Sequence, residues 1–180
     1  MKNKYLIFSA IILPMMFILG GCEDTKIEDQ KDPEVFFEVS YANTAWGRQF
    51  KGLIIDNEGK IKTYDNPPKW NKALDKNGLT QEQLDENLAS SSISSITLSE
   101  ADFHNYASKV AILSDTAYTK PAIGGVDRGI TSFYAYRFDA TKMTYKPILL
   151  SETGDLEKHN KDKNAKEISE WLTKVLDDVY

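Results

Sequence analysis

The sequence predicts an α+β domain, with a mostly antiparallel sheet built from two hairpins and about three helices packed against it. In each half of the chain, a pair of short segments rich in β-branched and aromatic residues flanks a turn sequence. Between and after these pairs, apolar residues recur at helical spacing behind capping residues. Hairpins and helices that are segregated along the chain in this way are typical of α+β domains.

The first predicted strands lie within residues 35–64. Segment 35–41 consists mainly of strand-forming residues, and segments 53–55 and 60–64 flank the sequence Asp56-Asn57-Glu58-Gly59. That sequence is typical of a hairpin loop, because Asp and Asn favour turn starts and glycine accepts a positive φ. We do not expect a calcium site here, since an EF-hand loop needs further oxygen ligands and a terminal glutamate at fixed spacings.

Two helices are predicted in the middle of the chain. Thr80 and Gln83 form a capping box at the start of the first, and Ser99 is the expected N-cap of the second. A serine-rich segment, 89–96, separates these two helix signals. The apolar face of the second helix consists of Phe103, Tyr106, Ala107, Val110 and Leu113.

The second hairpin and a last helix complete the domain. Segments 133–138 and 143–150 are the expected strands, and residues 139–142 are the turn between them. Pro147 cannot donate a ladder hydrogen bond, so we expect its strand to lie at an edge or to be bulged there. The last helix is expected from about 163 to 178, entered through Asn164, with Ala165, Ile168, Leu172, Val175 and Val179 on its apolar face.

Residues 1–21 have the layout of a secretion signal. Lys2 and Lys4 precede an apolar run, 5–19, and two glycines follow it. The run is shorter than the ~20 residues that a membrane-spanning helix needs, and it contains Pro14. A permanent transmembrane anchor is therefore the weaker interpretation.

The lone cysteine follows this segment directly. The sequence Leu19-Gly20-Gly21-Cys22 resembles the lipobox of bacterial lipoproteins. The resemblance implies cleavage before Cys22, a thioether from its thiol to a diacylated lipid with palmitate-type chains, and anchoring to the membrane through two or three acyl chains. An alkylated sulfur is no nucleophile, metal ligand or disulfide partner. The alternative is an unmodified cysteine at the end of a hydrophobic run.

Residues 22–33 are highly charged and contain a single aliphatic residue, so we expect an acidic tether before a single globular domain, 34–180. The start Glu23-Asp24 is similar to the sorting signals of outer-membrane lipoproteins, which implies a location in the bacterial cell envelope, facing the periplasm or the surface. Removing segment 1–21, which has two lysines and no acid, changes the formal net charge from −5 to −7. A chain this acidic is not expected to bind nucleic acid.

No catalytic motif stands out in the domain. The sequence has no Gly-x-Ser-x-Gly elbow, no P-loop and no dinucleotide fingerprint. His104 and His159 lie outside any metal-binding motif, and we interpret both as solvated side chains. The acidic residues are too numerous for one pair to be chosen as a glycosidase acid and base. We therefore expect no cofactor and no metal.

Five residues in connecting segments are the candidate binding residues. Trp46 and Arg48 lie between two predicted strands, and Trp70 follows the first hairpin. Asp127 and Arg128 lie in the glycine-rich connection 123–129. Exposed tryptophans stack on sugars or anchor protein partners, and binding residues gather on loops. The alternative is that the tryptophans cover the core and the glycine-rich segment is only a connection.

Two segments resemble an uncharacterised group of small bacterial secreted proteins and lipoproteins. They are 45–65, AWGRQFKGLIIDNEGKIKTYD, and 145–172, YKPILLSETGDLEKHNKDKNAKEISEWL. The group carries no catalytic residues to transfer. In the second segment, Gly154-Asp155 and Asn160 have turn and cap chemistry, and Trp171 is expected against the sheet.

Together these observations predict an envelope lipoprotein with a non-enzymatic binding domain for a protein or glycan partner. The first alternative is a hydrolase of envelope glycans or peptides. Two buried acids across a cleft, or a histidine beside a serine, would favour the hydrolase. The second alternative is an envelope inhibitor or immunity protein, for which the acidity would suit a basic toxin.

Overall fold

A computed structural model describes residues 35–45, 47–73 and 77–180. The chain divides into two units at residue 30, and all described residues belong to the second unit. Within them, eight strands and three helices follow one another. In chain order these are β1 Val35–Asn43, β2 Gln49–Asp56, β3 Lys60–Asp65, α1 Gln81–Ala89, β4 Ser92–Thr97, α2 Glu100–Val110, β5 Ala122–Ile123, β6 Ile130–Asp139, β7 Thr144–Gly154, β8 Leu156–His159 and α3 Lys163–Val179.

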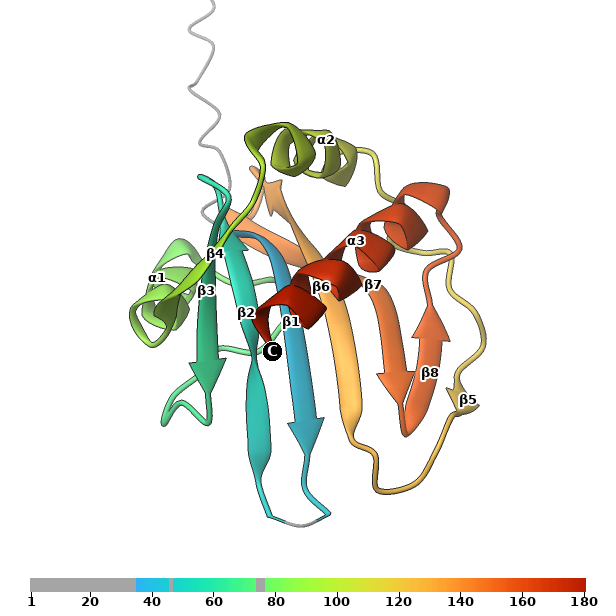
Figure 1. Cartoon of the computed structure of the whole chain (residues 1–180). Helices are drawn as coiled ribbons and strands as arrows, with labels where there is room; N and C mark the ends of the chain where they lie inside the picture. The colour runs from blue at the N-terminus through green and yellow to red at the C-terminus, as the bar shows by residue number, and fades with distance from the viewer. Residues whose placement is uncertain (1–34, 46, 74–76) are drawn as a thin grey trace, which may run out of the picture. The chain divides into compact units, whose positions relative to one another are not determined.

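The described strands form one open antiparallel sheet in the order β4-β3-β2-β1-β6-β7-β8-β5. With three helices against it, the α+β class is confirmed (Figure 1). The sheet has more strands than two hairpins supply. The central strand β1 pairs along most of its length with β2 on one side and with β6 on the other.

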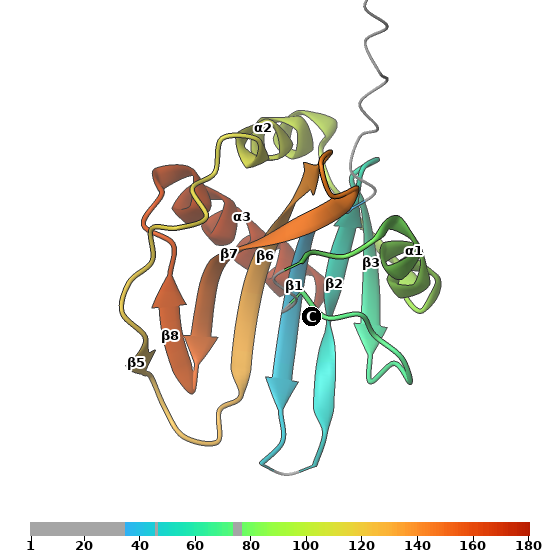
Figure 2. The same ribbon diagram turned by 180° about the vertical axis from the view of Figure 1, so that it is seen from behind.

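The two faces of the sheet are covered differently. One face, which we call the helical face, packs against α2 and α3 (Figure 1). The opposite face, which we call the pocket face, packs against α1 and the segment before it, and Figure 2 views the sheet from this side. Because side chains alternate along a strand, Phe37 and Val39 of β1 enter the core of the helical face, and Glu38 points the other way.

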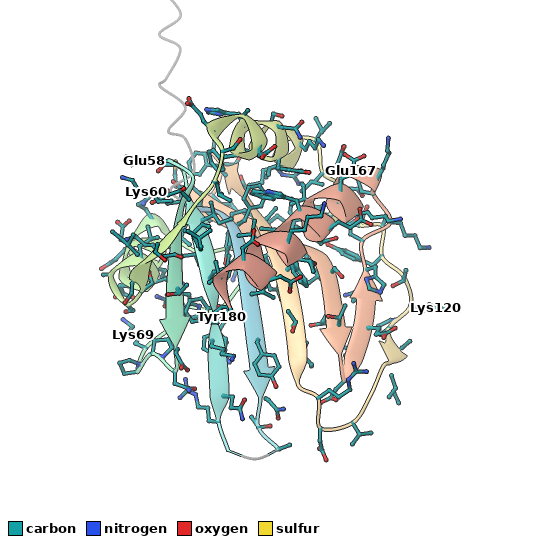
Figure 3. All side chains as sticks on the ribbon, viewed as in Figure 1. Glu58, Lys60, Lys69, Lys120, Glu167 and Tyr180 are labelled. Carbon is teal, nitrogen blue, oxygen red and sulfur yellow. The ribbon has the colours of Figure 1, made fainter. Side chains whose placement is uncertain are left out.

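The last helix is held against the sheet along the apolar face that the sequence predicts. Ala165, Ile168, Leu172 and Val175 are buried, and Trp171 packs edge-on against the ring of Phe37 with 5.2 Å between centroids. At its end, the Tyr180 hydroxyl donates to the Gly52 carbonyl at 3.0 Å, which ties the C-terminus to β2 (Figure 3).

Two of the three predicted helix starts are confirmed. Thr80 and Gln83 form the reciprocal capping box of α1, and the Ser99 hydroxyl accepts from the Asp102 amide at 3.1 Å. The prediction that Asn164 begins the last helix is wrong. Asp162 is the N-cap, and its carboxylate accepts the Asn164 amide at 2.8 Å. An Asp two residues earlier is an equally good cap, so local sequence alone does not decide between them.

The hairpin loop before β3 has the predicted turn chemistry. One carboxylate oxygen of Asp56 accepts the amides of Glu58 and Lys60 at 3.0 and 2.9 Å, and Gly59 has a φ of 75°. The side chains of Glu58 and Lys60 pair beside it (Figure 3). Among the described residues, no group of three or more His, Cys, Asp or Glu side chains is placed to hold a metal ion.

The sequence analysis missed three strands and placed one histidine wrongly. The serine-rich segment forms strand β4, which is an edge strand with mostly exposed side chains and so lacks an apolar alternation. Strands β5 and β8 are too short to carry a pattern, and His159 lies in β8 rather than in a polar loop. The prediction that the strand of Pro147 lies at an edge or is bulged there is wrong, because β7 lies between β6 and β8 and its register shift falls nearer Ser151. The proline is tolerated because β8 pairs with β7 only at Ser151 and Glu152, so Pro147 faces a strand partner on the β6 side alone.

In the part of the chain that the structure describes, no helix has both the length and the apolar character needed to cross a membrane.

Candidate functional site

The pocket face contains a small pocket beside the segment that covers its core. Its volume is about 160 Å³, and strands β1, β2 and β6 form most of its wall. A cavity of roughly this size holds one benzene-sized ring. The lining residues are Glu38, Ser40, Ala42, Phe50, Lys72, Ala73, Ile130, Ser132, Tyr134 and Glu152.

Glu38 is the unusual residue of this pocket. It lies on the central strand β1 and is only 2% exposed, although carboxylates are almost never buried unless they are paired. The Tyr64 hydroxyl and the Trp70 indole nitrogen donate to Oε1 at 3.0 and 3.1 Å, and the Tyr136 hydroxyl donates to Oε2. Three neutral donors from three different segments therefore hold one carboxyl group.

A glycine in β2 makes room for this cluster. Gly52 lies opposite both Ser40 of β1 and Tyr64 of β3. A Cβ atom at Gly52 would lie 2.0 Å from the Val39 carbonyl oxygen and 2.7 Å from the Tyr64 hydroxyl. Such distances are closer than van der Waals contact allows, so a larger residue would displace the strand or the hydroxyl that donates to Glu38.

Burial controls the ionisation of the cluster. Burial raises the pKa of Glu38, while the hydrogen bonds from Tyr136, Tyr64 and Trp70 lower it by a smaller amount. Burial also raises the pKa of Tyr64 and Tyr136 well above the usual value of a tyrosine. The two hydroxyls therefore keep their protons at neutral pH and remain donors to the carboxyl group.

A second carboxylate and a lysine complete the polar lining. The Ser132 hydroxyl donates to Oε1 of Glu152 at 3.2 Å. The Lys72 ammonium lies 5.1 Å from the centroid of the Phe50 ring, within cation–π distance. Neither Glu38 nor Glu152 forms an ion pair with any residue that the structure describes.

A serine and a histidine also meet on the helical face. Ser151 and His159 are cross-strand neighbours, and Ser151 Oγ lies 2.9 Å from Nδ1 of His159. Ser151 is 7% exposed and lines a groove of about 390 Å³ beside α3. Among the described residues, no carboxylate bonds to the imidazole to orient it. His104 lies elsewhere, on α2, where its Nε2 is 3.6 Å from Oε1 of Glu100.

Of the residues that the sequence singled out, Trp70 belongs to the Glu38 cluster. Its half-buried ring lies 3.8 Å from the Tyr64 ring, centroid to centroid, and packs against the core of the pocket face. The expectation that Trp70 covers the core is therefore met, and its indole also positions Glu38. Trp46 and Cys22 lie outside the described residues.

The other candidates lie away from the pocket. Arg48, Asp127 and Arg128 are exposed and do not line it. The 124–129 loop is held in place by Asp155, whose carboxylate accepts the amides of Arg128 and Gly129 at 2.8 and 3.1 Å. The turn role predicted for Asp155 thus extends to fixing this neighbouring loop.

The loop is also tied to β1. The Asn43 amide donates to the Asp127 carbonyl at 3.2 Å, and the Tyr41 hydroxyl donates to the Arg128 carbonyl at 3.2 Å. Asp127 has a φ of 60°, in the left-handed region. In both bonds the loop contributes backbone carbonyls, and the Arg128 guanidinium donates to the Gly124 carbonyl of the same loop at 3.4 Å.

In comparisons with models of known protein families, with curated proteins and with solved structures, this chain has no match. The candidate site therefore rests on the geometry of the described residues.

The Glu38 cluster has the features of a ligand site. It combines a concave surface, a few convergent polar groups and a carboxyl group whose pKa is raised by burial. One signal for it is present in the sequence, an acid within the apolar strand 35–41. We missed it because an acid in a strand is usually on a solvated face.

Proposed function

We propose that this chain is a lipid-anchored lipoprotein of the bacterial envelope whose domain binds a small ligand, without catalysis, at the Glu38 pocket. The lipobox resemblance at Leu19-Gly20-Gly21-Cys22 supports the anchor. The charged stretch 22–33 supports a tether, and the Glu23-Asp24 start supports the outer membrane.

The observation that carries the binding function is Glu38 itself. A buried carboxyl group with no ion pair among the described residues is costly to keep away from water. Here three donors hold the group in one position at the wall of a pocket. Preorganised polar groups in a small concave site are what ligand recognition requires.

The anchor is tested by replacing the acylated residue. Cys22→Ser removes the thiol that accepts the lipid, so we expect an uncleaved precursor without fatty acid. Metabolic labelling with a palmitate analogue, followed by gel electrophoresis, measures both effects. Normal processing and labelling of the Cys22→Ser chain would contradict the proposed anchor.

The binding site is tested by filling the pocket. Ala42 is exposed and lines the pocket, so Ala42→Trp should occupy the space without disturbing the core. We expect the small-molecule fraction of an envelope extract to raise the melting temperature of the wild-type protein and to leave that of Ala42→Trp unchanged. Thr173→Trp, in the groove of the helical face, is the matched control and should respond like wild type. A response that Thr173→Trp loses and Ala42→Trp keeps would move the site to the helical face.

A hydrolase is the second candidate, because the structure contains a histidine beside a serine and two acids in one pocket. Ser151 and His159 meet the distance that an activated nucleophile needs, but no described carboxylate orients the imidazole. Covalent labelling of Ser151 by a fluorophosphonate, lost in His159→Ala, would favour the hydrolase over the binding protein.

A further inference from the structure

The walls of the Glu38 pocket combine two kinds of side chain. Glu38 and Glu152 supply carboxyl groups, and Phe50 and Tyr134 supply aromatic rings. Rings carry negative charge on their faces and attract cations, and carboxylates do so more strongly. The exposed Lys72 is the one basic residue among the described residues that line the pocket.

The hydrogen bonds leave acceptor capacity on both acids. An ionised carboxylate offers about four acceptor positions. Glu38 uses three of them, two on Oε1 and one on Oε2, and Glu152 uses one for the Ser132 hydroxyl. A ligand that donates hydrogen bonds or carries positive charge therefore finds unused acceptors, and an anionic ligand finds repulsion.

The position of Lys72 is also informative. Its ammonium lies over the Phe50 ring and forms no ion pair with Glu38 or Glu152. The aromatic wall thus already holds one cation at the pocket, while the two carboxyl groups stay unpaired among the described residues.

We propose that the ligand of this pocket carries an ammonium group, primary or methylated, on a body no larger than a single ring. This inference rests on the proposed binding function and names the class of ligand. The Glu38 and Glu152 carboxylates would face the charge, and the Phe50 and Tyr134 rings would contact the carbon atoms around it. The acidity of the whole chain would also draw cations toward it.

Choline and its uncharged counterpart 3,3-dimethylbutanol test the proposal, because they differ mainly by a nitrogen cation in place of a carbon atom. Calorimetric titration of the purified full chain should show choline binding about tenfold tighter or more, because the trimethylammonium charge is attracted by the carboxylates and by the ring faces, and the uncharged analogue is not. Glucose serves as an uncharged polyhydroxyl probe and should not bind.

Three variants make the test specific. Glu152→Gln should weaken choline binding about tenfold, and it should fold normally because Glu152 makes one hydrogen bond to a serine. Glu38→Gln should weaken binding at least as much, with circular dichroism confirming its fold. Lys72→Gln should strengthen choline binding about two- to fivefold, because a like charge leaves the pocket.

The outcomes separate this inference from the proposed function. Equal affinity for choline and its uncharged counterpart, or unchanged choline affinity in both glutamate variants, would overturn the ammonium ligand. Glucose binding that Ala42→Trp abolishes would overturn the ammonium class while leaving the pocket as the binding site. Failure of the envelope extract to distinguish Ala42→Trp from Thr173→Trp would instead overturn the pocket as the site.

Discussion

At the scale of single residues, Glu38 is a buried carboxyl group held in place by three donors. Its three donors are 26, 32 and 98 residues away in sequence, and they come from β3, from the segment after it and from β6. Removing the carboxyl group with Glu38→Ala would take the acceptor from the Trp70 and Tyr136 donors and leave the Tyr64 hydroxyl only the Val39 carbonyl, at 3.5 Å. Each unsatisfied buried donor costs about 1–3 kcal/mol, so the loss of stability should be large.

The ionisation of Glu38 predicts a pH dependence of stability. Its pKa is raised in the folded state above the ordinary value of 4.5. Its contribution to the free energy of unfolding is therefore fully present below pH 4.5, and it is lost as pH rises through the folded pKa. Urea unfolding from pH 4 upward measures the free energy of unfolding of both proteins. The value for wild type minus the value for Glu38→Gln should fall by about 1.4 kcal/mol for each pH unit by which the folded pKa of Glu38 exceeds 4.5.

Glu58 supplies a control of opposite sign for this measurement. The hydrogen bond from Lys60 lowers the pKa of the exposed Glu58, so its contribution is present at neutral pH and is lost as pH falls. The difference between wild type and Glu58→Gln should therefore rise slightly with pH. A Glu38 difference that is constant, or that rises with pH, would show that burial does not control this group.

At the scale of elements, the features that depend on residues close together in the sequence were predictable. The capping box of α1, the cap of α2 and the apolar face of α3 each depend on residues within about four positions of one another. An ion pair then joins α2 to α3, with Lys109 Nζ 2.7 Å from Oε2 of Glu167. No local sequence pattern predicts this pair. Strand β4 was missed because it has no apolar pattern of its own. Its pairing with β3 makes it a strand.

The start of α3 gives a matched pair of variants. Asp162 caps the helix and also accepts the Ser114 amide at 2.8 Å, so Asp162→Ala should lower the free energy of unfolding by about 1–2 kcal/mol. Asn164→Ala removes no capping side chain and should change it by less than about 0.5 kcal/mol. Urea unfolding measures both. A cost for Asn164→Ala as large as that for Asp162→Ala would restore Asn164 as the cap.

At the scale of the whole domain, the site is a product of strand order and register. Pairing of β1 with β6 places Tyr134 opposite Glu38, and pairing of β2 with β3 places Tyr64 opposite Gly52. Sequence reasoning predicted strands at these places and the α+β class, but β1 and β6 lie far apart in the sequence, and no turn between them sets their register. The loop residues Arg48, Asp127 and Arg128 were predictable only as loop residues, and the structure places them away from the pocket.

The central claim is that the Glu38 pocket is where this protein binds its ligand. Amide chemical shifts of the isotope-labelled chain, recorded while the small-molecule fraction of an envelope extract is added, test it most directly. The account predicts shifts concentrated at Ser40, Ser132 and Glu152 and at the Trp70 indole. Shifts confined to Ser169 and Thr173 beside the Ser151–His159 pair, or no shifts at all, would contradict it.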